Sequence, residues 1–199
     1  MKLDIRQKIL DTAKKLFNEK GFNSVSTQEI AHELGISKGN LTYHFHKKEE
    51  IIEAIIKQWP RRETPAAPDN LEALDRYFRR MQDVVRENAF YFWHYAQMAQ
   101  LSPSIKDAQR EVYAVHRKIL SDAFRLLFEA GLIRGEGFPK EYERLIDALY
   151  LSIIYWLPFC ELRQEKDTDF QTHAWGIMHN LLTEQGRSRL ENLQNPPPA

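Results

Sequence analysis

Fourteen residues in a row, GISKGNLTYHFHKK at 35–48, contain three lysines and two histidines but no carboxylate. The whole chain has 28 basic and 28 acidic residues, so its formal charge is zero and this cationic character is local. Lysine, tyrosine, serine and helix N-termini all contact phosphate, and each contact releases counterions from a nucleic acid. A carboxylate on the same surface would be repelled. We therefore expect this stretch to face a polyanion.

Two short helices must position the acid-free stretch. Ser26, followed three residues later by Glu29, forms a capping box, so one helix begins there. That helix stops at Gly35, and Ser37 can cap the next helix, from about Lys38 to His44. Two helices joined by a short turn that contains glycine make a helix-turn-helix, whose second helix can enter the major groove of DNA.

The helix expected from about Lys38 to His44 is the third of the chain, after a first helix that precedes Gly21. Its outward face carries the residues that could meet DNA. On a helical wheel Leu41 and Phe45 share the face that points into the core, while Gly39 and Tyr43 lie opposite. The ammonium of Lys38 can meet guanine acceptors or a phosphate, and both interpretations remain open. A solvated helix face that happens to be basic is the alternative. Caps, turn and core pattern coincide with the acid-free stretch, which favours the DNA interpretation.

The stretch STQEIAHELGISKGNLTYHFHKKEEII resembles the DNA-binding region of the tetracycline-repressor (TetR, AcrR-type) family of bacterial transcriptional regulators. The residues that match the family pattern are Thr27, Ile30, Ala31, Gly35, Ile36, Ser37, Gly39, Leu41, His44, Phe45 and Lys48. The DNA contacts that the resemblance implies are Thr27, Ser37, Lys38, Gly39, Tyr43, His44 and Lys48. Thr42 stands where the family most often has tyrosine, and we expect it to contact DNA with a shorter reach. His44 is expected either to contact DNA or to pack against the first helix.

The chain is expected to be all-α, with about nine helices. Its 8 glycines and 9 prolines fall between stretches of helical periodicity, and no hairpin dipeptide separates alternating apolar runs. Beyond a fourth helix at about 47–59, further helices are expected at about 69–87, 90–101, 103–131, 140–163 and 168–185. The expected parts are a three-helix DNA-binding domain at 1–48, a connecting helix at 49–60, a ligand-binding and dimerisation domain at 61–190, and a disordered tail at 191–199. The proline-rich PRRETPAAP at 60–68 marks the boundary.

Aromatic residues concentrate in FYFWHYAQM at 90–98, where five aromatics in six positions cannot all face one core. We expect some of them to wall an apolar pocket with a few polar tips, and ordinary core packing is the alternative. The residues expected to line the pocket are Trp93, Tyr95, Met98, Tyr113, His116, Tyr150 and Ile154.

Apolar stripes on the last two expected helices are too wide for a single short core. An isologous four-helix contact between two copies would bury them, and the family resemblance implies the same homodimer. The residues expected at this interface are Leu149, Ile153, Trp156, Phe170, Ala174, Ile177, Met178 and Leu181. A dimer also reads two symmetric half-sites and so combines their binding free energies.

Catalytic and metal-binding patterns are not evident in the sequence. We see no paired carboxylates, no nucleophile with a base at plausible spacing, no phosphate loop and no His-x-x-x-His pair, and we expect no enzyme, no metal and no cofactor. The single Cys160 lies in an apolar run, and the longest apolar segment is shorter than the roughly 20 residues that span a bilayer. These features favour a cytoplasmic protein without membrane contact.

The sequence therefore predicts a homodimeric, sequence-specific transcriptional regulator, a repressor released from a palindromic operator by a small apolar or aromatic effector. The fourth helix, which joins the DNA-binding domain to the pocket domain, is expected to act as the lever. The alternatives are a DNA-binding regulator or interaction scaffold that needs no effector and, more distantly, a helical enzyme.

Overall fold

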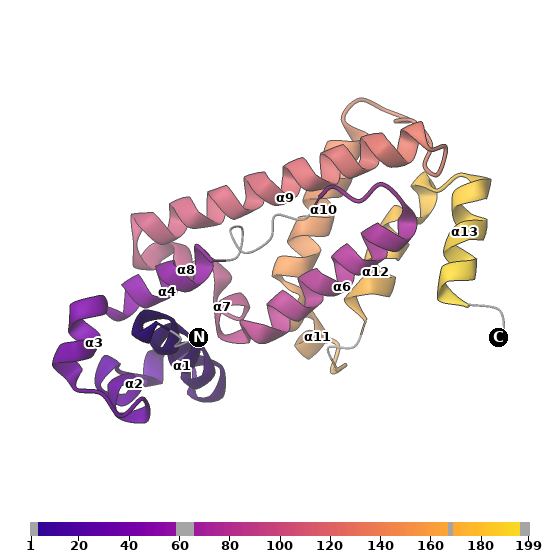
Figure 1. The fold of residues 1–199 in the computed structure, drawn as a ribbon. Coiled ribbons are helices and arrows are strands. Elements are labelled where there is room, and N and C mark those ends of the chain that lie inside the picture. The colour runs from indigo at the N-terminus through magenta and orange to yellow at the C-terminus, as the bar shows by residue number, and fades with distance from the viewer. Residues whose placement is uncertain (1–3, 59–65, 167–168, 196–199) are drawn as a thin grey trace. The chain divides into compact units, whose positions relative to one another are not determined.

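The computed structural model describes residues 4–58, 66–166 and 169–195 (Figure 1). These residues form twelve α-helices and two 3-10 helices, and no β-strand occurs among them. The all-α prediction is confirmed, with more helices than the nine expected. The predicted proline-rich boundary at 60–68 lies mostly outside the described residues.

The N-terminal helices lie close together in the fold (Figure 1) and bury a small apolar core. They are α1 (Ile5–Lys20), the 3-10 helix η1 (Phe22–Ser24), α2 (Thr27–Glu33), α3 (Lys38–His44) and α4 (Lys48–Ile56). Helix α1 packs against both α2 and α4, and α2 packs against α3. Isoleucines and leucines of all four helices are buried, so the three-helix arrangement of a helix-turn-helix domain follows from the periodicity of the apolar residues.

The remaining helices follow in chain order. They are α6 (Leu71–Glu87), α7 (Ala89–Phe92), α8 (Tyr95–Leu101), α9 (Pro103–Glu129), α10 (Glu141–Ile154), α11 (Trp156–Leu162), α12 (Phe170–Met178), the 3-10 helix η2 (His179–Leu181) and α13 (Glu184–Gln194). No single described helix is long and apolar enough to cross a bilayer; only α10 and α11 taken together, at a bend of 66°, reach that length and composition.

Three of the expected helices are interrupted. The helix expected at 90–101 is two helices, and the short α7 buries three successive aromatics, Phe90, Tyr91 and Phe92, which one straight helix could not do. The helix expected at 140–163 breaks at Tyr155, because Pro158 has no N–H and its ring crowds the carbonyl four residues earlier.

The third interruption produces an additional helix, α13, which was not expected from the sequence. The helix expected at 168–185 ends at Met178, and α13 begins after Thr183, whose Oγ1 accepts the N–H of Gly186 at 3.1 Å. The predicted disordered tail at 191–199 is therefore wrong for residues 191–194, which are helical, while 196–199 lie outside the described residues.

The described residues form two compact units, each with more contacts within itself than with the other. The first comprises the residues up to 58 together with Asn88–Val112, and the second comprises 66–87 and the residues from Tyr113 onward. Residues 88–112 thus pack with the N-terminal helices, whereas the sequence analysis placed them in the C-terminal domain. The functional domain boundaries drawn from the sequence remain a prediction.

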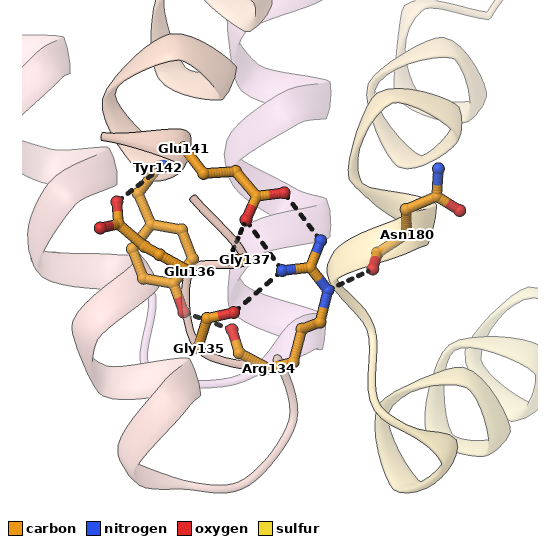
Figure 2. A network of polar contacts seen from close by, with 7 residues as sticks. All are labelled: Arg134, Gly135, Glu136, Gly137, Glu141, Tyr142 and Asn180. Atoms are coloured by element: carbon orange, nitrogen blue, oxygen red, sulfur yellow. Dashed lines mark hydrogen bonds and ion pairs between the residues drawn. The ribbon is translucent and has the colours of Figure 1, made fainter. Parts of the chain in front are cut away.

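A polar clasp fixes the loop between α9 and α10 in the second unit (Figure 2). The Glu141 carboxylate accepts two hydrogen bonds from the Arg134 guanidinium, at 2.8 and 2.7 Å, and a third from the Gly137 N–H at 2.7 Å. The Arg134 Nε also donates to the backbone carbonyl of Asn180, 3.0 Å away on η2. One buried carboxylate thereby ties the start of α10 to the C-terminal part of the chain.

Candidate nucleic-acid interface

Caps and a glycine turn fix α2 and α3 relative to one another. The Ser26 Oγ accepts the N–H of Glu29, and the Ser37 Oγ accepts the N–H of Asn40, both at 3.1 Å. Between the helices Gly35 has a φ of +65°, a left-handed conformation that glycine adopts without strain. The Ile36 N–H then donates to the Ala31 carbonyl at 3.0 Å. The sequence therefore dictates both the start of α3 and its angle to α2.

The two faces of α3 differ in exposure as the helical wheel predicts. Leu41 and Phe45 are buried in the N-terminal core. The exposed residues of α3 are Lys38, Gly39, Asn40, Thr42 and Tyr43. Tyr43 is the most prominent, with 82% of its surface exposed, although it is a large aromatic residue. A protruding phenol beside a lysine and amide and hydroxyl groups can bind phosphate and base edges.

The charge around α3 suits a polyanion. Lys38 and Lys47 are exposed near the two ends of α3, and the described stretch 35–48 has no acid. The nearest acids in sequence include Glu50, whose carboxylate accepts the backbone N–H of His46 at 2.8 Å. Glu29 of α2 is paired with Lys20 at 2.5 Å; that hydrogen bond, with help from the Ser26 backbone, lowers its pKa.

The predicted contacts at the edge of this face are less accessible. Thr27 is the first residue of α2 and is half-buried. His44 is also half-buried, and its ring lies edge-on to the Tyr43 ring at 5.2 Å. Both interpretations of His44 remain predictions. Asn40 and Lys47, which were not predicted as contacts, share the exposed surface, and membership of the acid-free stretch was the signal that could have identified them.

Lys48 is placed differently from the other predicted DNA contacts. Its ammonium donates to the carbonyls of Phe22, at 2.6 Å, and Val25, at 2.8 Å. It also lies 4.1 Å from the centre of the Phe22 ring. Burial lowers the pKa of Lys48. The side chain is directed toward the protein rather than away from it, and a direct DNA contact by Lys48 stays a prediction.

The residues predicted to line an effector pocket fall into two groups. Trp93, Tyr95 and Met98 belong to the first unit, and the other four residues belong to the second unit. In the first unit Met98 borders a small open depression of the surface, whose other lining residues are Phe22, Asn23, His94, Gln97 and Leu101.

An aromatic and polar cluster surrounds the predicted pocket residues of the second unit. The Tyr77 hydroxyl and the His116 Nδ1 are hydrogen-bonded at 2.7 Å, and burial lowers the pKa of His116 to about 4. The Tyr113 hydroxyl donates to the Asp147 carboxylate at 2.7 Å, and its ring lies edge-on to that of Tyr150 at 5.0 Å. Tyr77 and Asp147 were not predicted as pocket residues, because only the tertiary fold brings them to this cluster.

The predicted dimer interface needs correction. Seven of the eight residues are buried within the chain itself, and only Ile177 is half-exposed. The seven buried residues are Leu149, Ile153, Trp156, Phe170, Ala174, Met178 and Leu181. They belong to α10, α11, α12 and η2, and most of them lie where α6, α10 and α12 pack together, so they offer no surface to a second copy. A helical wheel cannot tell which of two apolar stripes a neighbouring helix of the same chain will cover.

The exposed apolar residues lie on a different stripe of the same helices. Leu151 lies on α10, Tyr155 lies at the break between the two helices, and Phe159 and Leu162 lie on α11. Leu151 is 58% exposed and Leu162 is 79% exposed. Single exposed hydrophobic residues are ordinary, whereas a contiguous group of them is typical of interaction surfaces. We call these four residues the apolar row.

Among the described residues no three histidines, cysteines, aspartates or glutamates gather as a metal site would require.

Comparison with known proteins agrees with this geometry. The family model described as bacterial regulatory proteins, tetR family, matches residues 9–55. The HTH-type transcriptional regulator QacR of Staphylococcus aureus is 29% identical over 150 residues, which cover 67% of this chain and 74% of QacR. The HTH-type transcriptional regulator UidR of Escherichia coli is 45% identical over 53 residues, 27% of each chain. The latter match therefore spans about a quarter of its relative.

The fold of almost the whole chain also has a counterpart among solved structures. A TetR-family transcriptional regulator from Marinobacter aquaeolei superposes with a TM-score of 0.84 at 24% identity, covering 96% of this chain and 98% of that chain. At this identity the likeness concerns the fold alone.

Proposed function

The chain carries the DNA-binding domain of the tetR family of bacterial regulatory proteins, and from this premise we propose that it is a homodimeric repressor that binds a palindromic operator and leaves it when a small effector binds. The observation that carries the proposal is the exposed, acid-free face of α3, presented by two capped helices around Gly35. An arrangement of this kind positions a helix for the major groove. The proposed location is the cytoplasm, where operator DNA is accessible.

The DNA contacts that we propose are the exposed residues of α3 and its cap. Ser37 and the start of α3 hold a phosphate, Lys38 meets a phosphate or a guanine, and Tyr43 reaches the backbone. Gly39 permits close approach, because nothing but the Ser37 Oγ, at 3.8 Å, lies near the position that a Cβ would occupy. Thr27 and His44 stand at the rim of the same surface.

Dimerisation is proposed through the apolar row of Leu151, Tyr155, Phe159 and Leu162. A second copy related by a two-fold axis would bring the same row against itself, as isologous contacts require. The helix-turn-helix domains of the two copies then bind the two half-sites of the operator, and their binding free energies combine. The row replaces the buried residues that the sequence analysis assigned to the interface.

The effector is proposed to be a small apolar or aromatic molecule that binds the cluster of Tyr77, Tyr113, His116 and Tyr150. The rings supply apolar contact, while the hydroxyls and the neutral imidazole supply a few oriented polar groups. Coupling of about 1–3 kcal/mol between effector and operator would change operator affinity 5- to 150-fold.

Helix α4 remains the proposed lever. Its Glu53 carboxylate accepts hydrogen bonds from the hydroxyls of Ser102 and Ser104, each at 2.7 Å, at the start of α9. Ser102 also caps α9, because its Oγ accepts the Ile105 N–H at 3.2 Å. A movement of the start of α9 is therefore passed to α4 within the first unit.

Selection of bound sites from a pool of random DNA tests the proposal. The expected result is an enriched palindrome whose half-sites are about one helical turn apart or a multiple of that distance. Recovery of sequences without a shared motif would contradict sequence-specific regulation. A palindrome whose affinity is unaffected by every compound that binds the second unit would instead favour a regulator without an effector.

A further inference from the structure

Lys48 stands apart from the two other lysines of the acid-free stretch. Lys38 and Lys47 are exposed, whereas Lys48 is half-buried and its ammonium points at two backbone carbonyls. An ammonium has three N–H donors, and two of them are used at 2.6 and 2.8 Å. The face of the Phe22 ring, 4.1 Å away, adds a cation–π contact. Three partners within the protein therefore hold this one charge.

The two carbonyls belong to the turn that leads into α2. Phe22 begins η1, and Val25 immediately precedes Ser26, the residue that caps α2. Lys48 itself is the first residue of α4, where the helix dipole disfavours a positive charge. The Lys48 side chain extends away from the N-terminus of α4. Its positive charge interacts favourably with the carbonyl dipoles of the turn. A single side chain thus fixes the entrance of α2 against the first turn of α4.

The Phe22 ring connects Lys48 to further aromatic residues of the first unit. We call the contacts of Lys48 with Phe22 and Val25 the Lys48 tie. The Phe22 ring lies edge-on to Phe17 of α1, with the ring centres 5.3 Å apart, and Phe17 in turn lies 5.1 Å from Phe90 of α7. The Phe90 N–H donates to the Asn18 side chain of α1 at 3.0 Å. The ammonium of Lys48 therefore lies at one end of a packed series of rings that connects the helix-turn-helix to α7.

We propose that Lys48 is a positioning residue of the DNA-binding unit, which holds the Phe22–Val25 turn so that α2 presents α3 in the reading position, and which gives no phosphate contact of its own. The inference deepens the proposed function and rests on it. It assigns different roles to adjacent lysines. Lys47 contributes positive charge that attracts DNA, and Lys48 fixes the position of α2 and, through it, of α3.

The dependence of binding on salt separates the two tasks. In full-length dimer, Lys48→Met retains the unbranched stem and removes only the ammonium, and Lys47→Met is the matched control at the neighbouring exposed position. Each lost phosphate contact reduces the slope of log affinity against log salt concentration by about 0.9, which is about 1.8 for a dimer. Lys47→Met is expected to flatten the slope, while Lys48→Met is expected to leave it unchanged. A slope flattened by Lys48→Met would overturn the proposal.

Discrimination between the selected operator and random DNA supplies the second readout. A misplaced α3 loses base contacts but keeps charge, so Lys48→Met is expected to reduce the affinity ratio of operator to random DNA by at least about fivefold. Lys48→Gln keeps two N–H donors without the charge and is expected to restore part of that ratio. Unchanged discrimination in the folded Lys48→Met protein would show a merely structural lysine and would also overturn the proposal.

Thermal unfolding without DNA tests the tie independently of the proposed function. Lys48→Met and Phe22→Leu are combined in a double-mutant cycle, with Lys47→Met and Phe22→Leu as the control pair. The Lys48 pair is expected to be coupled and the Lys47 pair additive. Additive effects for both pairs would overturn the positioning role even if DNA binds. Coupling without any selected operator would contradict the proposed function and not the tie.

Discussion

The hydroxyl of Thr42 donates a hydrogen bond to the backbone carbonyl of Lys38, 2.9 Å away and one turn earlier on α3. The hydroxyl proton is therefore engaged within the helix, and the methyl group is what the exposed side chain can offer as a new contact. A threonine methyl suits the C5 methyl of thymine in the major groove. The usual tyrosine of the family would reach farther at this position and would present a phenol instead.

Thr42 is therefore expected to read a thymine methyl. Replacement of the operator's thymines, one at a time, by uracil removes only that methyl, and one position in each half-site is expected to lower the affinity of the wild-type protein by about 1 kcal/mol or more. Thr42→Ser should abolish the difference between thymine and uracil at that position, and Thr42→Val should retain it. Equal affinities of the wild-type protein for all uracil-containing operators, measured by fluorescence anisotropy, would contradict this assignment.

Leu151 is expected to be required for dimerisation. A glutamate in its place puts a charge at the α10 end of the exposed apolar row, so Leu151→Glu should shift the protein to a monomer in sedimentation equilibrium. Operator binding should weaken because the half-sites are no longer bound together. Phe128→Glu is the control, since Phe128 is also an exposed hydrophobic residue but lies on α9, outside the row. A Leu151→Glu protein that remains dimeric would exclude this surface.

The clasp of Glu141 predicts a loss of stability in acid. The Arg134 guanidinium, and after it the Gly137 N–H, lower the pKa of Glu141 to about 2 from a usual value of 4.5. A lowered pKa adds stability above pH 4.5, and this contribution is lost as the pH falls toward 2. Glu141→Gln should therefore unfold more easily at pH 7, and its stability should change less between pH 4.5 and pH 2 than that of the wild type.

Denaturant unfolding at a series of pH values measures this difference. Glu143→Gln serves as the control, because Glu143 lies on the same helix but pairs with Arg117 at an exposed position, where an ion pair contributes little. Parallel pH profiles for the wild type and Glu141→Gln would show that the clasp does not contribute through its charge.

Gly186 is expected to tolerate no side chain. A Cβ at this position would lie 2.1 Å from the Leu132 carbonyl oxygen, so Gly186→Ala must push α13 away from the loop after α9. We expect a loss of stability of about 1–3 kcal/mol, typical of overpacking at a buried site. Gly39→Ala, where a Cβ meets no atom nearer than 3.8 Å, should instead stabilise α3 by up to about 1 kcal/mol. Thermal unfolding without DNA compares the two; equal melting temperatures for Gly186→Ala and the wild type would refute the constraint.

Local signals account for the parts of the fold that the sequence predicted well. Ser26 and Ser37 cap their helices through their own side chains, and Gly35 makes the turn by its own conformation, so neither feature depends on distant residues. The exposed face of α3 could be predicted for the same reason, because burial of Leu41 and of the C-cap residue Phe45 fixes the orientation of so short a helix.

Features that depend on distant partners could not be predicted in this way. The start of α13 depends on Thr183 and on close packing of Gly186 against Leu132, which the local sequence does not reveal. The inward direction of Lys48 depends on carbonyls more than twenty residues earlier in the chain. The sequence predicts a dimer interface on the buried stripe of α10. This prediction fails because α6, which covers the stripe, lies far away in the sequence.

The contact of Phe17 with Phe90 limits how the DNA-binding helices α1 to α4 can be transferred to another protein. A fragment that ends after α4 would strip one aromatic neighbour from the centre of its own core and leave Asn18 without the backbone N–H that it now accepts. A chimaeric regulator made by joining these helices to a foreign sensor should therefore carry residues 88–112 along with them, so that the graft consists of two separate pieces of chain rather than one.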